Sequence, residues 1–171
     1  MTIKDLSTTE YLPYFQNYIN QVGNIELIEG LENGLHEIKT FYQSIPKDKL
    51  EYRYAEGKWT IKEVIVHLLD TERIFCYRAL RFSRKDKTPV SGFEQDDYVA
   101  NSESNARSIE DLIEEFVVLR QSTICMFKSF ARKTLLNKGI AGSGEVSVRA
   151  LGFLIIGHEK HHCRIIEERY L

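Results

Sequence analysis

Apolar side chains recur at the three- and four-residue spacing of an α-helix in four stretches of the chain. Asn24 is the expected N-cap of the first helix. The apolar residues that follow it share one helical face: Ile25, Ile28, Leu35, Ile38 and Tyr42. Thr60 should cap the second helix, because Glu63 stands at the spacing of a capping box, and the helical pattern continues to Phe82.

The third helix is expected from Ser108, with Asp111 three residues later. It carries a narrow apolar seam: Leu112, Phe116, Leu119, Thr123, Met126 and Phe130. Ser147 should open the fourth helix, whose inward series is Val148, Leu151, Ile155, His158, His162 and Ile165. No segment alternates in the manner of a strand. The pattern therefore predicts an all-α protein, a four-helix bundle with one domain over residues 1–171.

The remaining segments include one more candidate helix and two long connections. Ser7 and Glu10 have the spacing of a capping box, so a short extra helix is expected between Ser7 and Tyr18. Residues 44–59 and 84–107 form the long connections, and loops of that length are usually functional covers or linkers. Three residues suggest that the second connection packs over something: Pro89, Phe93 and Tyr98.

Composition and charge narrow the class of protein. Hydrophobic residues make up 43% and charged residues 28% of the chain, which is typical of a soluble globular protein. The net charge of −2 weighs against nucleic-acid binding. The basic residues that do cluster are interpreted as a solvated helix end: Arg78, Arg81, Arg84, Lys85 and Lys87.

The same composition bears on the compartment. No apolar run is long enough to cross a bilayer, and the N-terminal residues lack an apolar leader, so we expect a cytoplasmic protein without a membrane partner. The three cysteines lack a CxxC spacing and are expected to stay reduced: Cys76, Cys125 and Cys163.

Two histidines occupy core positions of the fourth helix. His158 and His162 lie four residues apart, so their imidazoles can converge on one metal ion. His67 is the best candidate for a third ligand, because it lies among apolar residues of the second helix. Three unpaired imidazoles in a core would each cost about 1–3 kcal/mol, and a shared cation would remove that cost. The sequence therefore predicts a metal site of His67, His158 and His162.

Other side chains leave alternatives open. His36 is interpreted as a surface or boundary residue. His161 could take the place of His162 as a ligand, and otherwise lines the pocket or contacts a partner. Cys163 could add a ligand, although a small buried residue needs no function.

Residues 158–162 also spell HExxH, the zincin signature, in which a glutamate activates water. Glu159 is accordingly the candidate catalytic base, although a solvated glutamate beside a ligand is an equal alternative. The extended metalloprotease pattern requires glycine and histidine where this chain has Ile165 and Glu168. A protease is therefore disfavoured.

These motifs together resemble those of the DinB/YfiT-like superfamily, in particular its DinB_2-type members. The likeness rests on KWTIKEVIVHLLDTERIFCYRALRF, DKTPVSGFEQDDYV, SVRALGFLIIGHEKHH and ERYL, in that order. The resemblance implies an up-down-down-up bundle and a divalent metal held by His67, His158 and His162. Related members act as thiol S-transferases, thiol-dependent isomerases or hydrolases. The stretch TLLNKGIAGSGEV is the least similar.

Both lines of reasoning predict a metal-dependent enzyme, a thiol S-transferase or a hydrolase acting on a small molecule. A divalent transition metal (Zn, Ni, Fe or Mn) would lower the pKa of a bound low-molecular-weight thiol or water. Neighbouring residues have expected supporting roles: Asp70 or Glu63 orienting His67, Trp59 as a pocket wall or a hydrophobic staple, and Arg73 or Arg78 attracting a carboxylate-bearing thiol.

The alternative is a non-enzymatic bundle that binds a metal or a small ligand, such as a dimeric stress-response protein. The resemblance also implies a homodimer, because the family contains dimers.

Overall fold

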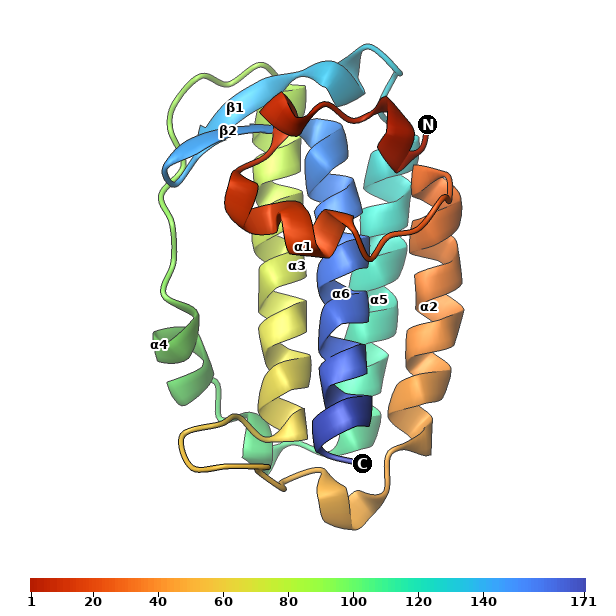
Figure 1. The fold of residues 1–171 in the computed structure, drawn as a ribbon, viewed down its shortest axis with the longest axis vertical. Coiled ribbons are helices and arrows are strands. Elements are labelled where there is room, and N and C mark those ends of the chain that lie inside the picture. Colours follow the sequence, from red (N-terminus) through yellow and green to blue (C-terminus); the bar gives the residue numbers. More distant parts are fainter.

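The computed structural model describes residues 1–171, and four long helices dominate it (Figure 1). These helices are α2 (Leu27–Ser44), α3 (Ile61–Ser83), α5 (Ile109–Lys128) and α6 (Val148–Arg169). Helix α3 packs on α5 and α6, and α2 packs on the same two helices from the other side. Helices α3 and α5 run in one direction and α2 and α6 in the other, which is the up-down-down-up order that the resemblance implied (Figure 1).

Side-chain caps begin three of these helices as expected. Thr60 and Glu63 form the complete capping box, with hydrogen bonds of 3.1 and 2.7 Å. Ser108 caps α5, but the carboxylate of Asp111 pairs with Arg107 and does not close a box. Ser147 caps α6 through the backbone N–H of Ala150.

The first of the four helices starts later than predicted. Asn24 is not its N-cap, because α2 begins at Leu27 with Glu26 in the cap position. The backbone N–H of Leu27, one of the first N–H groups of the helix, donates to the carbonyl of Met1.

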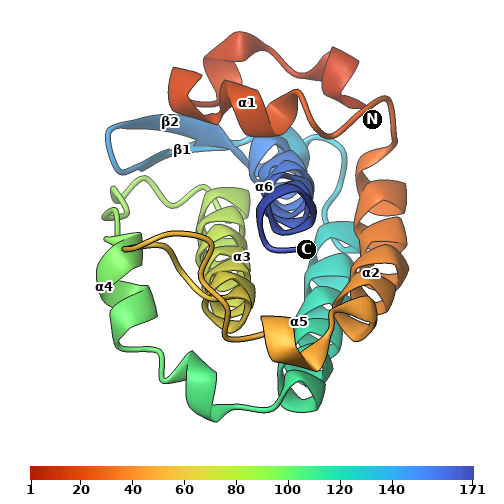
Figure 2. The same cartoon turned by 60° about the horizontal axis from the view of Figure 1, so that its bottom comes forward.

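The predicted N-terminal helix is broken into short turns. Two 3₁₀ turns (Thr8–Glu10 and Pro13–Phe15) precede the four-residue α1 (Gln16–Ile19). The segment crosses the outside of α6 (Figure 2). The crossing is close at Gly157, where an added Cβ would lie 2.1 Å from the carbonyl oxygen of Tyr18. A side chain at that position would push the segment away.

The predicted all-α bundle is confirmed, with the addition of a small two-stranded β-hairpin before α6 that the pattern did not predict. Strand β1 (Lys138–Ala141) pairs antiparallel with β2 (Gly144–Ser147) around a turn at Gly142, whose φ is +61°. Gly139 lies on the ring of Phe82, too close for any side chain at this position. The hairpin also exchanges hydrogen bonds with Val90, so it anchors the start of the long connection.

The core is divided across the middle of the bundle. One apolar cluster fills the end near the hairpin, and a second fills the end that holds the C-terminus. The layer between them contains buried polar side chains: His67, Thr71, Glu72, Arg120, Thr123, His158 and Glu159. We call this the polar layer.

No helix has both the length and the apolar character required to cross a membrane.

Candidate metal centre

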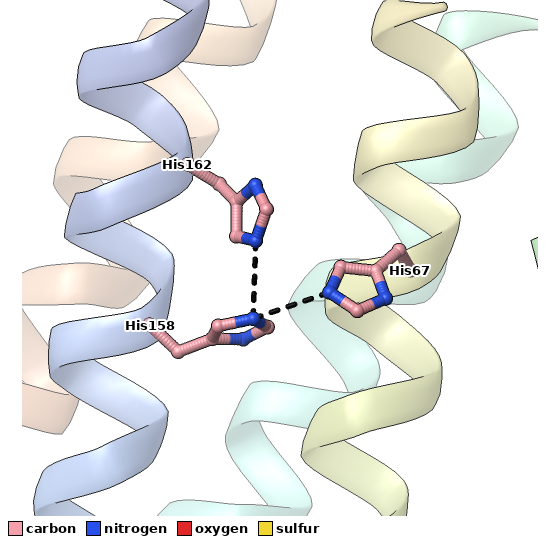
Figure 3. A group of neighbouring side chains, drawn as sticks. All are labelled: His67, His158 and His162. Atoms are coloured by element: carbon pink, nitrogen blue, oxygen red, sulfur yellow. Dashed lines mark hydrogen bonds between the residues drawn. The ribbon is translucent and has the colours of Figure 1, made fainter. Parts of the chain in front are cut away.

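The structure brings the three predicted ligands together within the bundle. His67 extends from α3, and His158 and His162 extend from consecutive turns of α6 (Figure 3). The Nε2 atom of His158 lies 3.1 Å from that of His67 and 3.1 Å from that of His162. One nitrogen from each ring falls in a group whose members lie within 4.8 Å of one another. We call these residues the histidine cluster.

Hydrogen bonds among the three rings cannot satisfy all the converging nitrogens of the histidine cluster. A ring nitrogen either carries a proton or offers one lone pair, so Nε2 of His158 can form a good hydrogen bond with only one of its two neighbours. Three nitrogens around one metal ion at about 2.0–2.1 Å, in tetrahedral geometry, would lie about 3.3 Å apart. The two separations from His158 are close to that value, and all three ligand atoms lie within 4.8 Å of one another. The donor set therefore fits a divalent transition metal.

The electrostatics keep these imidazoles neutral at physiological pH. Burial lowers the pKa of His67 to about 4, although Asp96 opposes the shift. Burial, together with His67 and His161, lowers the pKa of His162 to about 3. The pKa of His158 is also lowered well below its ordinary value, again chiefly by burial. Neutral rings have lone pairs available for a metal ion.

Aromatic rings hold the imidazoles in place. The ring of Trp59 lies against that of His67, with centroids 4.8 Å apart. Its carbonyl accepts a 2.7 Å hydrogen bond from the hydroxyl of Tyr170. Tyr18 packs edge-to-face on His158, at 5.0 Å between centroids. Trp59 thus contacts a predicted ligand directly, and the N-terminal segment contributes to the site through Tyr18.

The other histidines and Cys163 lie apart from the convergence point. His36 is exposed on α2, as predicted. His161 packs against Tyr18, and its Nδ1 lies 3.2 Å from the amide nitrogen of Gln21. Cys163 packs beside the apolar cluster at the C-terminal end. Of the two adjacent histidines, His162 is the one that points toward His67 and His158.

Glu159 is buried, so the expectation of a solvated glutamate is wrong. Its carboxylate accepts a 2.5 Å hydrogen bond from Arg120, which also forms two hydrogen bonds of 3.0 and 2.8 Å with Glu72. Thr123 donates to Glu72 as well. We call Glu72, Arg120 and Glu159 the arginine cluster. Burial opposes ionisation of Arg120, but the two carboxylates outweigh it and raise its pKa.

The remaining polar candidates divide into surface and buried groups. Asp70 and Glu63 form no hydrogen bond with His67; Asp70 pairs with Arg73, and Glu63 completes the helix cap. Arg73 lies on the surface and also pairs with Glu115. In contrast to Arg73, Arg78 is buried and only 6% exposed. The interpretation of Arg78 as part of a solvated helix end is therefore wrong.

A cavity of about 430 Å³ opens beside the histidine cluster. His67 and His158 form part of its lining, and Arg78 lies along the same wall. The long connection covers it through Phe93 and the start of the short helix α4 (Gln95–Ala100). Phe93 thus packs over the cavity as predicted, whereas Pro89 and Tyr98 are exposed.

Sequence reasoning missed the arginine cluster. The signal available was the position of Arg120 on the inward face of α5, four residues after Phe116 and three before Thr123. An arginine at such a position requires a buried acid partner, but periodicity does not identify which one.

The fold and the histidine cluster define a helical-bundle protein with a candidate metal centre. Residues 31–166 match the model of the DinB superfamily, which is most of the chain. The chain therefore belongs to the DinB superfamily.

Known proteins with related sequences or structures agree with this assignment. The chain is 25% identical over 158 residues to a protein of Oceanobacillus iheyensis named "Putative metal-dependent hydrolase OB0413", covering 83% of this chain and 86% of that protein. YfiT from Bacillus subtilis, described as a probable metal-dependent hydrolase with an unusual four-helix bundle topology, matches with a TM-score of 0.76. The identity is 16%, over 93% of this chain and 91% of YfiT.

A mycothiol-dependent maleylpyruvate isomerase also has this fold, with a TM-score of 0.65 and 12% identity. The match covers 96% of this chain but only 62% of the isomerase. At these identities the two solved structures establish the fold alone.

Proposed function

We propose that this protein is a metal-dependent hydrolase in which His67, His158 and His162 hold one divalent transition metal, zinc, nickel, iron or manganese. The observation that carries the proposal is the convergence of two buried imidazoles and one half-buried imidazole beside a cavity large enough for a small molecule. The name of the relative from Oceanobacillus iheyensis supports the same class of reaction.

Different residues of the chain would bind the metal and orient its ligands. A bound divalent metal supplies Lewis acidity, which lowers the pKa of water or a thiol and polarises a carbonyl. His67, His158 and His162 leave the side toward the cavity open for a substrate. Trp59 and Tyr18 hold the imidazole rings in orientation, and Phe93 shields the cavity from water.

Glu159 has a different proposed role from that of a base. Its carboxylate is engaged by Arg120 and is absent from the lining of the cavity, which supports a role in positioning α6. The base role remains a prediction. Loss of turnover with full metal content and unchanged stability in Glu159→Gln would support the base role over the positioning role.

Transfer of a low-molecular-weight thiol is the second candidate reaction. The volume beside the histidine cluster supports it, because about 430 Å³ has room for both a small thiol and an acceptor. A panel of ester, amide and electrophilic substrates, with and without an added thiol, distinguishes the two reactions. Turnover only in the presence of the thiol favours transfer, whereas turnover with water alone favours hydrolysis.

Metal content provides the first test. Protein purified without added metal should contain about one transition-metal ion per chain, measured by plasma mass spectrometry. His67→Ala and His158→Ala should lose it, whereas the exposed His36→Ala should keep it. Wild-type protein that takes up no metal on dialysis against any of the four ions would contradict the proposal.

Turnover separates an enzyme from a non-enzymatic binding bundle. Wild-type protein that contains metal but turns over none of the panel would favour a binding protein, and hydrolysis of peptides that disappears in Glu159→Gln would favour a protease.

A homodimer is also part of the proposal. Tyr77 and Leu80 are 53% and 40% exposed on α3, which supports a self-association surface there. Light scattering at micromolar concentration should give twice the mass of the chain, and Leu80→Glu should give a monomer.

A further inference from the structure

Arg78 is a buried cation without an acidic partner. Its Nη2 donates a 3.0 Å hydrogen bond to the carbonyl of Ser91, but its Nε has no partner and no carboxylate forms an ion pair with it. Arg120 shows the usual arrangement, in which carboxylates surround a buried guanidinium. An uncompensated charge in a core is costly, so it persists where something outside the chain pairs with it.

Arg78 lies on the same wall of the cavity as the histidine cluster. His67, Thr71, Phe75 and Arg78 follow one another along α3 at spacings of four, four and three, and all four line the cavity. Arg78 comes eleven residues after His67, which is about 16 Å along a helix axis. An anion at Arg78 and a reacting group at the histidines would therefore belong to opposite ends of an elongated molecule.

Aromatic rings line the cavity between these two ends. They come from the N-terminal segment, α3 and the long connection: Tyr14, Phe15, Tyr18, Phe75 and Phe93. Such walls favour a flat or apolar body. Glu94 and Asp96 also line the cavity, but both are exposed, so water solvates their charges. They disfavour a ligand with several negative charges at the rim.

We propose that the cavity binds a monocarboxylate with an apolar body, with the carboxylate paired to Arg78 and the opposite end directed to the histidine cluster. The inference deepens the proposed function and rests on it for the position of the reacting group. Anion recognition by Arg78, however, requires only the cavity and the unpaired guanidinium.

The test compares a carboxylate with its neutral isostere. Calorimetry would measure binding of 4-phenylbutyrate and 4-phenylbutyramide to zinc-loaded and chelator-treated protein, with inorganic phosphate as a third probe. A hydrogen-bonded charge contributes enough to favour the acid over the amide by about tenfold or more. Phosphate should bind more weakly than the acid. The preference for the acid should persist without zinc, because it arises at Arg78 and not at the metal.

Variants of two arginines on α3 show whether the preference for the acid arises at Arg78. Arg78→Gln should abolish the preference and Arg78→Lys should restore part of it. The matched control Arg73→Gln, at an arginine outside the cavity, should keep the preference in full. Thermal unfolding of each variant verifies folding, and metal analysis of each reports separately on the proposed function.

Four results would overturn the inference. They are equal binding of acid and amide, no binding of the acid at millimolar concentration, a preference that survives in Arg78→Gln, and a preference that requires zinc. A wild-type protein that takes up no metal on dialysis but still prefers the acid would contradict the proposed function and leave anion recognition intact.

Discussion

The polar layer contains two clusters built in opposite ways from neighbouring residues of α6. Glu159 belongs to the arginine cluster, in which guanidinium and carboxylates meet at 2.5–3.0 Å. His158 belongs to the histidine cluster of three neutral rings, in which its Nε2 lies 3.1 Å from the Nε2 atom of each of the other two. In the first cluster every charged group has an oppositely charged partner, although Nη1 of Arg120 forms no hydrogen bond, whereas the second cluster contains no opposite charge.

This difference separates a structural role from a binding role. Buried polar groups that pair with one another can hold helices in register without any ligand. Buried groups that converge without mutual satisfaction indicate a partner supplied from outside the chain. On this argument the arginine cluster positions α3, α5 and α6, and the histidine cluster and Arg78 bind ligands. The predictions below test that separation.

Replacement of Arg120 should change the free energy of unfolding more than any other substitution considered. Arg120→Met leaves two buried carboxylates uncompensated, so the free energy of unfolding should fall by about 3–5 kcal/mol, measured by urea denaturation. The triple variant Glu72→Gln, Arg120→Met, Glu159→Gln removes the charges together and should recover most of the loss. A fall below about 1 kcal/mol in Arg120→Met would show that the cluster is not structural.

Stabilisation by zinc should follow the histidine cluster alone. At free zinc a thousandfold above the dissociation constant, the folded wild-type protein should gain about 4 kcal/mol in urea denaturation. His162→Ala should lose most of this gain, whereas the neighbouring His161→Ala should retain it. Equal loss in both variants would indicate that the arrangement in Figure 3 is not the binding geometry.

The packing of α2 against the arginine cluster gives a smaller effect. A Cβ at Gly34 would lie 2.6 Å from Nη1 of Arg120 and 2.8 Å from Oε1 of Glu159. Gly34→Ala should therefore lower the free energy of unfolding by about 1–3 kcal/mol. The control is Gly92→Ala, where a Cβ meets nothing within 4 Å, and that variant should have wild-type stability.

The smallest expected effect concerns a third buried ion pair, between Glu10 and Arg149 at the start of α6. Burial opposes ionisation of Glu10, but hydrogen bonds from Arg149 and the backbone of Ser7 outweigh it, so the pKa of Glu10 is lowered. A depressed pKa contributes stability that is present above the unfolded-state pKa, about 4.5, and is lost as pH falls through the folded-state value.

The stability advantage of wild type over Glu10→Gln should therefore shrink as pH falls below about 4.5. Urea denaturation across a pH series measures it. An advantage that grows in acid would contradict the assigned sign.

The sequence predicted the bundle because its helical signals are local. Three of the four caps, and the inward face of α6 with its two histidines, follow from spacings of three and four residues. The hairpin was missed because its strands are four residues long, although Gly142 and Gly144 mark the turn. The first N–H of α2 is satisfied by the carbonyl of Met1, a contact that no local pattern contains.

The sequence likewise predicted the members of the histidine cluster but not the buried residues around it. The convergence of His67 with the α6 pair follows from the positions of the three histidines on the inward faces of two helices that pack together. The buried state of Glu159 and Arg78 could not be derived, because each depends on which face of a helix a neighbouring element covers. The partner of Arg120 lies 48 residues away in sequence, beyond the reach of periodicity.

A crystal structure of zinc-loaded protein would show directly whether the histidine cluster holds the metal. We expect one strong anomalous peak in each chain, with Nε2 of His67, His158 and His162 each at about 2.0–2.1 Å from it. A peak elsewhere, for example at Cys163, or a histidine cluster that stays free of metal in saturating zinc, would contradict this expectation.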